Sequence, residues 1–578
     1  MNIMFRMATV STAIASIFIT TALSQSGWHG RSGGTAAASP GVAFTNANAE
    51  TAVGSVGTML RIPLDGFWAG SSADSPDVPI KGKTSATRVA QFVFVWSYSP
   101  GDSSRLDSVR HYSTVENSIK VSADGRRVAY LANSKYDASV GCVPSDAMWR
   151  NKLSAVVDGK MEKCYDNIGG SPIFSPDGKR VAYMALSNSS WFVVLDGKEE
   201  KLYSSMSTLV FSPDGKRVAY NAMSGHKWCV VVDGKEEKQY DGIGEGDPVF
   251  SPDGKRVAYT AQLGKQWFVV VDGKEYRRYD GIGQNEPIFS PDGKRVAYIA
   301  QSADKCFVVV NGNEGKHYDG IAALVFSPDG KRVAYTANLG DKWLVVVDGK
   351  EENQYDGIGQ NDPIFSPDGK RIAYTATLGG KWFVVVDGKE DHQYDAVFKS
   401  TFSSDGKRVA YTARTTKTWF AVVDGNEQKH YDKIAPGHLI FSPDGNRVAY
   451  NASSGDKWFV VVDGREGKQY DSASVPVFSP DGNRVAYAAR RGEKSFVVVD
   501  GNEEKQYYST SDPVFSPDGK RVAYVAQSGP EEFVVVDGTE ERGYDGIISG
   551  SGIIFDSATH LHYLASRGPE IYLVEEDF

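Results

Sequence analysis

The sequence predicts an all-β protein built from about twelve four-stranded units, and three observations lead to this prediction. The decapeptide FSPDGKRVAY at 250–259 returns almost unchanged from Phe289, Phe326 and Phe365, and again further on. Its Asp recurs every 37 to 39 residues after a first interval of 53, ending in a degenerate copy at Asp556. Val-rich runs and Asp-Gly turns separate the copies. A fixed period of about 40 residues is typical of repeat architectures.

One unit, residues 248–286, shows how the strands divide. The first strand, PVF, runs into the tight turn SPDG, where Pro presets φ and Gly takes a positive φ. KRVAYTA is the second strand, WFVVV is the third, and an Asp-Gly hairpin leads to the charged fourth strand KEYRRYD. The second and third strands are apolar on both faces, so neighbouring sheets must cover them on both sides. These features favour a β-propeller of four-stranded blades; a right-handed β-solenoid is the alternative.

The number of rings and their closure are further predictions. Most propellers have about four to eight blades, so we expect two rings of about six blades, at 109–360 and 361–578. One oversized ring is the alternative, because the spacing does not break near the middle of the chain. The last unit ends after its third strand, and VRHYSTV at 109–115 aligns with the fourth-strand pattern KQYDGI. We expect residues 109–115 to complete the last blade and hide its open edge.

The SPDG-K-R-V-A-Y unit resembles the WD40-like propeller repeats of TolB-type periplasmic proteins. It also looks like the non-catalytic propellers of prolyl-oligopeptidase-type peptidases. The resemblance covers about residues 109–578 and implies the propeller fold. Two features depart from it: the hairpin VVVDGKE is more regular than in a typical TolB-type blade, and the first unit has SADG in place of SPDG.

The N-terminal residues have a different composition. Arg6 precedes an apolar run that ends at Leu23, and small residues follow, which predicts a secretory signal peptide at 1–24; an uncleaved anchor is the alternative. Residues 25–56 are expected to be a flexible spacer, and 57–108 an irregular or partly stranded lead-in. The mature chain is expected to have no membrane span and to be periplasmic or extracellular. The net charge of −9 without a basic block argues against a nucleic-acid partner.

Four cysteines are too few for a disulfide scaffold. Cys142 lies in an insertion of the first unit, and Cys164 lies late on the fourth strand of the same blade, so a disulfide between them is a hypothesis that an exported protein permits. Cys229 and Cys306 are expected to be buried, inert thiols.

The loops on one face of the propeller differ between units, whereas SPDGKR and DGKE on the other face barely change. Function usually lies in such loops on a rigid scaffold, although drift without function is the competing interpretation. We expect a protein or peptide partner to bind this face. The candidate binding residues are Lys135, Tyr136, Trp149, His226, Asp304 and His438.

Recurring aromatic and acidic residues have simpler interpretations than a site. The Trp five residues before each Asp-Gly, as at Trp267, is expected to pack between blades rather than to bind sugars. Acidic pairs flank the inter-blade loops and have the oxygen ligands that Ca²⁺ prefers, but solvated turn residues are favoured, and no cofactor is expected. These weak metal candidates are Asp241 with Asp247, Asp280 with Glu286, and Asp356 with Asp362.

Catalysis has little support in the sequence. The nine His are scattered, and His560 with His562 is only a weak metal hint. No hydrolase domain follows the propeller, unlike in the peptidases that the repeat resembles. We expect an exported, non-enzymatic propeller; the alternatives are a hydrolase or lyase acting on glycans or peptides at the channel mouth, and a structural envelope component.

Overall fold

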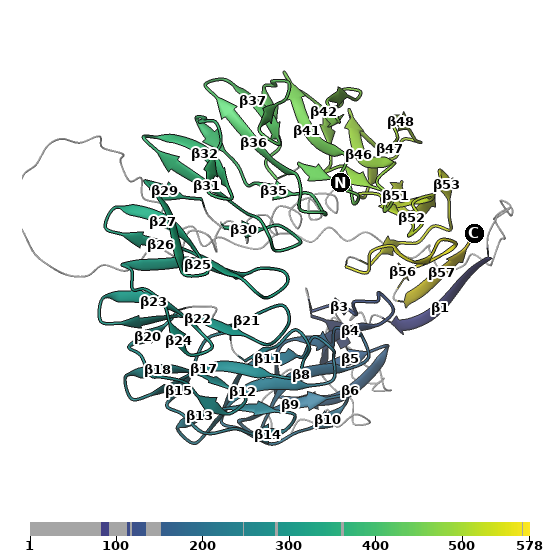
Figure 1. Ribbon diagram of the computed structural model, residues 1–578. Coiled ribbons are helices and arrows are strands. Elements are labelled where there is room, and N and C mark those ends of the chain that lie inside the picture. The colour runs from purple at the N-terminus through teal and green to yellow at the C-terminus, as the bar shows by residue number, and fades with distance from the viewer. Residues whose placement is uncertain are drawn as a thin grey trace, which may run out of the picture. The chain divides into compact units, whose positions relative to one another are not determined.

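The computed structural model describes residues 83–91, 112–115, 118–134 and 152–578, the last range without 247, 284–286, 360–362, 438, 549 and 569. The described residues all belong to one compact unit. In the described residues all regular structure is β-strand, as Figure 1 shows. The predicted signal peptide, the spacer and most of the lead-in lie outside the described residues.

The strands form twelve sheets, which we number as blades 1 to 12 in the order of their second strands. The first strand of a blade is a single strand or two short segments that pair with the same second strand. The first strands are β2(Tyr112–Thr114) with β3(Lys120–Val121), β7(Asn167–Phe174), β11(Ser205–Phe211), β15(Gly242–Ile243) with β16(Val249–Phe250), β20(Gly281–Ile282) with β21(Ile288–Phe289), β25(Gly320–Phe326), β29(Gly357–Ile358) with β30(Ile364–Phe365), β34(Ala396–Val397) with β35(Thr401–Phe402), β39(Lys433–Ile434) with β40(Ile440–Phe441), β44(Ser472–Ala473) with β45(Val477–Phe478), β49(Ser509–Thr510) with β50(Val514–Phe515), and β54(Gly546–Ile547) with β55(Ile554–Ser557).

The second and third strands form the long central hairpin of each blade. The second strands are β4(Val128–Ser134), β8(Val181–Ser187), β12(Val218–Ser224), β17(Val257–Leu263), β22(Val296–Ser302), β26(Val333–Leu339), β31(Ile372–Leu378), β36(Val409–Thr415), β41(Val448–Ser454), β46(Val485–Arg491), β51(Val522–Ser528) and β56(His560–Arg567). The third strands are β5(Lys152–Val157), β9(Ser190–Leu195), β13(Lys227–Val232), β18(Gln266–Val271), β23(Lys305–Val310), β27(Lys342–Val347), β32(Lys381–Val386), β37(Thr418–Val423), β42(Lys457–Val462), β47(Lys494–Val499), β52(Glu531–Val536) and β57(Glu570–Asp577).

The fourth strands are mostly short and lie on the outer side of the blades (Figure 1). They are β6(Lys160–Tyr165), β10(Lys198–Glu199), β14(Lys235–Glu236), β19(Lys274–Glu275), β24(Asn313–Glu314), β28(Lys350–Tyr355), β33(Lys389–Glu390), β38(Asn426–Glu427), β43(Arg465–Glu466), β48(Asn502–Glu503), β53(Thr539–Glu540) and, in blade 12, β1(Lys83–Gln91).

The hairpin between the third and fourth strands explains the recurring Asp-Gly. In blade 4, Asp272 and Gly273 have φ of 50° and 76°, so both central residues are in the left-handed region that a two-residue hairpin requires. Asp tolerates this region better than most residues, and Gly has no Cβ to oppose it. The sequence therefore sets this turn locally, once in each repeat.

The core consists of twelve clusters of buried side chains, and each cluster joins two neighbouring blades. Between blades 3 and 4, Ala219 and Val230 of one sheet face Tyr259 and Phe268 of the next. Tyr259 is 1% exposed and Phe268 is 0% exposed. The expectation that each sheet is covered on both faces is confirmed, and the four-stranded propeller prediction with it.

The blades form a single ring, so the expected division into two rings at 109–360 and 361–578 is wrong. One cluster joins blades 6 and 7 and includes Val345 and Tyr374, which lie on opposite sides of the expected boundary in the sequence. Another joins the last blade to the first and includes Leu564 and Tyr130. Because the surfaces that meet are nearly the same at every position, nothing interrupts the ring halfway, and the alternative of one oversized ring is observed.

The strand that completes blade 12 also differs from the expectation. β1 pairs antiparallel with β57 from Lys83↔Asp577 to Gln91↔Glu570 and so supplies the outer strand. Within residues 109–115, which were expected in that place, β2 pairs instead with β4 on the inner edge of blade 1. β2 lies only a few residues before β3 in the chain, and both segments enter the same blade, as the paired first-strand segments do elsewhere.

Candidate functional site

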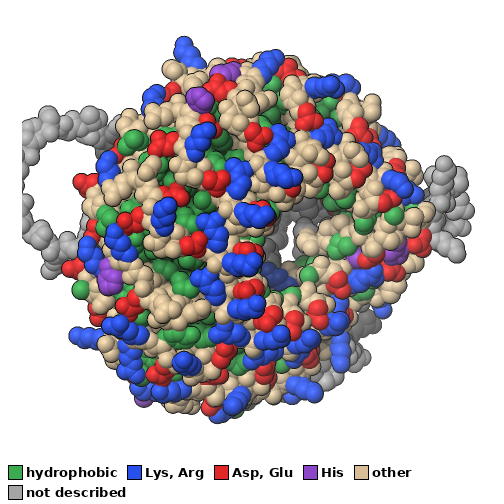
Figure 2. Space-filling model, in the orientation of Figure 1, with side chains coloured by type: hydrophobic (Ala, Val, Ile, Leu, Met, Phe, Trp, Pro, Cys, Tyr) green, Lys and Arg blue, Asp and Glu red, His purple; other side chains and the backbone are tan. Residues whose placement is uncertain are grey.

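The two faces of the propeller carry different connections. Because the strands of a blade are antiparallel, the SPDGKR turn and the Asp-Gly hairpin lie at one end of the sheet, which we call the turn face. The loop between the second and third strands and the link to the next blade lie at the other end, which we call the loop face. Figure 2 shows that basic and acidic side chains are interspersed over the visible side of the molecule.

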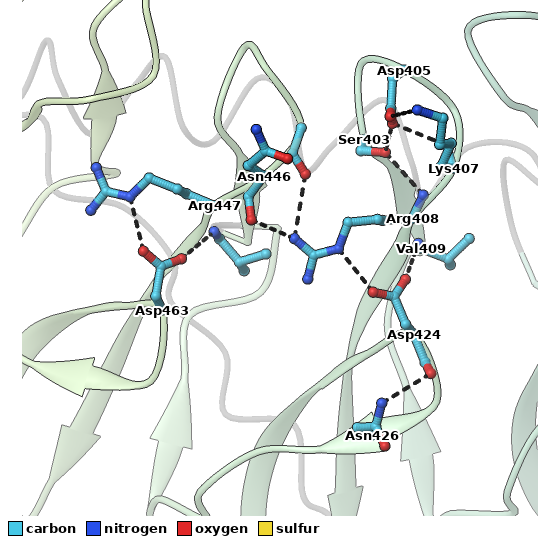
Figure 3. Close-up of polar contacts among 12 residues, drawn as sticks. Ser403, Asp405, Lys407, Arg408, Val409, Asp424, Asn426, Asn446, Arg447 and Asp463 are labelled. Atoms are coloured by element: carbon cyan, nitrogen blue, oxygen red, sulfur yellow. Dashed lines mark hydrogen bonds and ion pairs between the residues drawn. The ribbon is translucent and has the colours of Figure 1, made fainter.

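An arginine on the turn face connects each of blades 1 to 11 to the next blade. In blade 8, Arg408 donates from Nε to Asp424 of its own hairpin at 2.9 Å and from Nη1 to the Asn446 carbonyl of blade 9 at 2.6 Å (Figure 3). Its guanidinium lies 5.3 Å from the ring centre of Phe441 in blade 9. These latch arginines, each stacked on a Phe of the following blade, are Arg127, Arg180, Arg217, Arg256, Arg295, Arg332, Arg371, Arg408, Arg447, Arg484 and Arg521.

The Ser, Asp and Gly of the decapeptide have structural roles as well. Ser403 donates to Asp405 at 2.6 Å, and the Lys407 backbone N–H donates to the same carboxylate oxygen at 3.1 Å (Figure 3). These bonds stabilise the ionised carboxylate and lower the pKa of Asp405, and the bond from Ser403 has the largest effect. A Cβ on Gly445 of the next blade would lie 3.2 Å from Asp405 Oδ1, so successive turns touch. The near-identity of the decapeptide follows from blade-to-blade contact.

The acidic residues proposed as weak metal candidates connect blades on the loop face. Asp241 pairs with Lys227 of the preceding blade and accepts the Gly264 N–H of its own blade at 2.7 Å. Asp356 is bonded in the same way, and Asp280 accepts the Ala303 N–H at 2.8 Å. The Gly264 N–H and the Lys227 ammonium lower the pKa of Asp241. The other members of the pairs, Asp247, Glu286 and Asp362, lie outside the described residues.

The candidate binding residues fall into two groups. His226 and Asp304 are exposed at the tips of loops between second and third strands. Lys135, Tyr136, Trp149 and His438 lie outside the described residues. The equivalent exposed tip residues of other blades are Lys265, Asp341, Lys417, Asp456 and Glu493. The loop face therefore presents different side chains from blade to blade.

The recurring tryptophans are half-buried on the third strands. Trp267 exchanges backbone hydrogen bonds with Tyr279, 2.9 and 2.8 Å long. Trp419 lies 4.9 Å from Phe398 between ring centres and packs on the core between blades 8 and 9. For Trp419 the structure agrees with packing between blades.

The histidine pair at the C-terminus belongs to the ring closure. His562 is fully buried; its Nδ1 is 2.7 Å from Asp556, and its Nε2 is 2.6 Å from the Asp124 carbonyl of blade 1. Arg126 of blade 1 bonds Asp556 at 2.9 Å and Glu575 at 2.7 Å. These contacts replace the latch arginine that blade 12 lacks. Within the part of the chain that the structure describes, no group of three or more potential ligands is placed to hold a metal.

The cysteines differ in state. Cys164 is disulfide-bonded. Cys142, its expected partner, lies outside the described residues. Cys229 and Cys306 are free, and burial raises the pKa of Cys229 to about 11, so its thiol is a poor nucleophile.

The turn face also has grooves, which the sequence analysis missed because it treated this face as invariant. They lie between blades 7 and 8, blades 5 and 6, and blades 10 and 11, with volumes of about 690, 410 and 260 Å³. Departures from the repeat at Asn311 and Gly315 are the signal that could have pointed to one of them.

The fold and these contacts define a twelve-bladed β-propeller with one face committed to blade contacts and one face of variable loops. No protein-family model matches the chain, and no curated protein matches it. Solved structures do match. TolB from Acinetobacter baumannii is 20% identical, with a TM-score of 0.21, covering 48% of this chain and 78% of its own.

Two further solved structures show the same kind of likeness. The β-propeller domain of the Trilobed protease from Pyrococcus furiosus is 13% identical, with a TM-score of 0.24, covering 49% of this chain and 95% of its own. A eukaryotic initiation factor is 14% identical, with a TM-score of 0.31, covering 57% of this chain and 96% of its own. TolB and a peptidase propeller are thus among the matches, as the resemblance in sequence predicted. With values this low, function has to be argued from the chain's own residues.

Proposed function

We propose that this chain is an exported, non-enzymatic β-propeller scaffold that binds a protein or peptide through its loop face. One observation carries the proposal: the two faces use their residues differently. On the turn face, the recurring Ser, Asp, Gly and Arg are engaged in contacts within and between blades. On the loop face, the tips that differ between blades are exposed. A rigid frame with variable, exposed loops suits recognition of a macromolecular surface.

The charges of the tips favour a basic partner. Four tips of the loops between second and third strands carry carboxylates and two carry lysines. The acidic tips are Asp304, Asp341, Asp456 and Glu493, and the basic tips are Lys265 and Lys417. Exposed charges of one sign steer an oppositely charged partner and fix its register, so a peptide richer in Lys and Arg than in acids fits this face.

Export is the second part of the proposal, and it has two supports. The N-terminal sequence matches a signal peptide. A disulfide-bonded Cys164 suits an oxidising compartment. In the described residues, no helix has the length and the apolar character that crossing a membrane would require.

The test is selection of peptides on the purified full-length chain, followed by mapping of the bound peptide with hydrogen exchange. Replacing Asp304, Asp341 and Asp456 together by Lys should weaken binding of a selected basic peptide. The matched control replaces three turn-face lysines, Lys255, Lys294 and Lys370, by Glu; these side chains are 80%, 81% and 81% exposed. Loss of binding in the control alone would refute the loop-face assignment. Turnover of a glycan or peptide panel would favour the hydrolase or lyase instead.

A further inference from the structure

The grooves of the turn face share a common plan. Each is lined by the latch arginine of one blade, by residues at or beside the hairpin between its third and fourth strands, and by the second strand of the next blade. In the groove between blades 7 and 8, the latch arginine Arg371 donates from Nε to Asp387 at 2.9 Å. On the opposite wall, the Tyr411 hydroxyl donates to Asp391 at 2.8 Å. The groove between blades 10 and 11 has the same two pairs. In both grooves, carboxylates of the protein accept the hydrogen bonds that the arginine and the tyrosine donate.

The groove between blades 5 and 6 lacks both of these carboxylates. Asn311 stands where the other hairpins have Asp, and Gly315 stands where Asp391 stands in blade 7. The tyrosine on the opposite wall, Tyr335, therefore faces Gly315 without a carboxylate; a Cβ at Gly315 would lie 3.7 Å from the hydroxyl. Gly315 lines this groove of about 410 Å³, and Asn311 lies at its edge, in the hairpin between the lining residues Val310 and Asn313.

The latch arginine of this groove keeps its structural contacts and loses its ion pair. Arg295 donates from Nη1 to the Lys331 carbonyl at 2.7 Å and stacks on Phe326, 5.2 Å from the ring centre. Its Nε and Nη2 make no hydrogen bond or ion pair with any residue that the structure describes, whereas each of the other ten latch arginines pairs with a carboxylate. The Nε–Nη2 edge is the one that binds a carboxylate or phosphate in bidentate fashion.

Asn311 cannot take the place of the missing carboxylate. Its Oδ1 already accepts the Val296 N–H at 2.9 Å, so its other terminal atom is the amide nitrogen, which only donates. A donor therefore stands where the other blades place the acceptor for the arginine. Arg295 and Asn311 therefore both present N–H groups without a partner among the described residues, and neither side chain offers an acceptor to the other.

The acidic residues that line this groove are engaged elsewhere. Glu314 pairs with Arg277 at 2.8 Å and accepts the Tyr279 hydroxyl at 3.0 Å. Asp348 pairs with Arg332 of its own blade at 2.9 Å. Of the basic groups that line the groove, the Lys331 side chain is 80% exposed and pairs only with the Asp of its own turn, at 3.5 Å. Among the three grooves, this is thus the one in which carboxylates of the protein neutralise the basic side chains least.

We propose that the groove between blades 5 and 6 binds an anionic group, a carboxylate or a phosphate, through the free Nε–Nη2 edge of Arg295. The Asn311 amide and the Tyr335 hydroxyl donate to the same group, and Lys331 adds charge at the rim. The volume accommodates an acidic side chain, a uronate or a phosphorylated group. This site lies on the face opposite the loops and does not depend on the proposed function.

The test is isothermal titration calorimetry of the full-length chain at low ionic strength, with glutarate and inorganic phosphate as separate probes. The wild-type chain should bind at least one probe with one equivalent, and the stronger probe identifies the anion class. Asn311→Asp restores the carboxylate found in the other hairpins, so it should fold normally and weaken binding about tenfold or more. Binding should also weaken with added salt.

Matched variants separate the site from general charge effects. Lys331→Asn should weaken binding severalfold without disturbing the turn, because blades 9 and 10 carry Asn446 and Asn483 at this position. The same change at Lys407, in the groove between blades 7 and 8, should leave binding unchanged. Failure of the wild-type chain to bind either probe, or binding by Asn311→Asp that equals the wild type, would overturn the proposal.

Discussion

The contact between successive SPDG turns can be measured with two glycines of blade 4. Gly254 has a φ of 70°, and a Cβ there would lie 2.7 Å from Asp214 Oδ1 of blade 3. Gly264 has a φ of 62°, and a Cβ there would meet nothing within 4 Å. Replacing either by Ala places a Cβ in the left-handed region, but only Gly254→Ala also forces two blades apart.

The expected magnitudes follow from these two contributions. The left-handed conformation costs Ala about 1–2 kcal/mol, which is the whole effect at Gly264. Gly254→Ala adds an overpacking cost of about 1–3 kcal/mol, so the free energy of local opening should fall by about 2–5 kcal/mol.

Hydrogen exchange of the turn amides in blades 3 and 4 is the appropriate assay, because a ring of repeats opens locally before it unfolds globally. Gly254→Ala should speed exchange in both blades, and Gly264→Ala should act on blade 4 alone. Equal effects of the two variants, confined to blade 4, would show that the turns do not hold each other and would refute this account of the decapeptide.

Three further predictions follow from the structure. Burial raises the pKa of Tyr240 to about 12; since the neutral form is favoured in the fold, the stability it contributes is complete below about pH 10 and is lost as the pH rises toward 12. Denaturant midpoints should fall over that range together with tyrosinate absorbance, and a flat profile would contradict this. Ala86→Pro removes a backbone donor from β1, so exchange should rise in β57 and stay unchanged in β42; a uniform response would argue against closure by β1. Peptide mapping without reduction should recover Cys164 joined to Cys142, and a free Cys164 thiol would contradict the disulfide.

Much of each blade could be predicted from local sequence. The apolar second and third strands, the Asp-Gly hairpin and the charged fourth strand recur with one spacing, and the structure places them in one sheet per repeat. The burial of Tyr259 and Phe268 follows from the same pattern, because residues on opposite faces of one sheet are both apolar. Alternation and turn chemistry act over a few residues, so they can be read without knowing the ring.

The ends of the ring were predicted less well. VRHYSTV matches the link between blades, and that link contains both the end of one fourth strand and the start of the next first strand. Alignment with it could not tell which of the two strands residues 109–115 would form. β1 has no counterpart within the repeat, so no pattern pointed to it as the closing strand.

The candidate site divides in the same way. Exposed loop tips such as His226 and Asp304 were predicted from the variation between units. The acidic residues such as Asp241 were considered as metal ligands, because their bonds to Lys227 and to the Gly264 N–H come from other strands and cannot be seen in the local sequence. The unpaired Arg295 was missed for the same reason. Asn311 replaces the Asp that pairs with the arginine in the other blades, and the importance of this replacement is visible only once those ion pairs are known.

The sequence by itself determined what one blade is: its strands, its two kinds of turn and its two apolar faces, all of which depend on neighbours along the chain. Only the tertiary structure decided how many blades share a ring, which strand closes it, and which groove keeps an unpaired arginine. Those outcomes depend on how the surfaces of successive sheets fit and on residues hundreds of positions apart, such as Arg126 with Glu575, which no local pattern brings together.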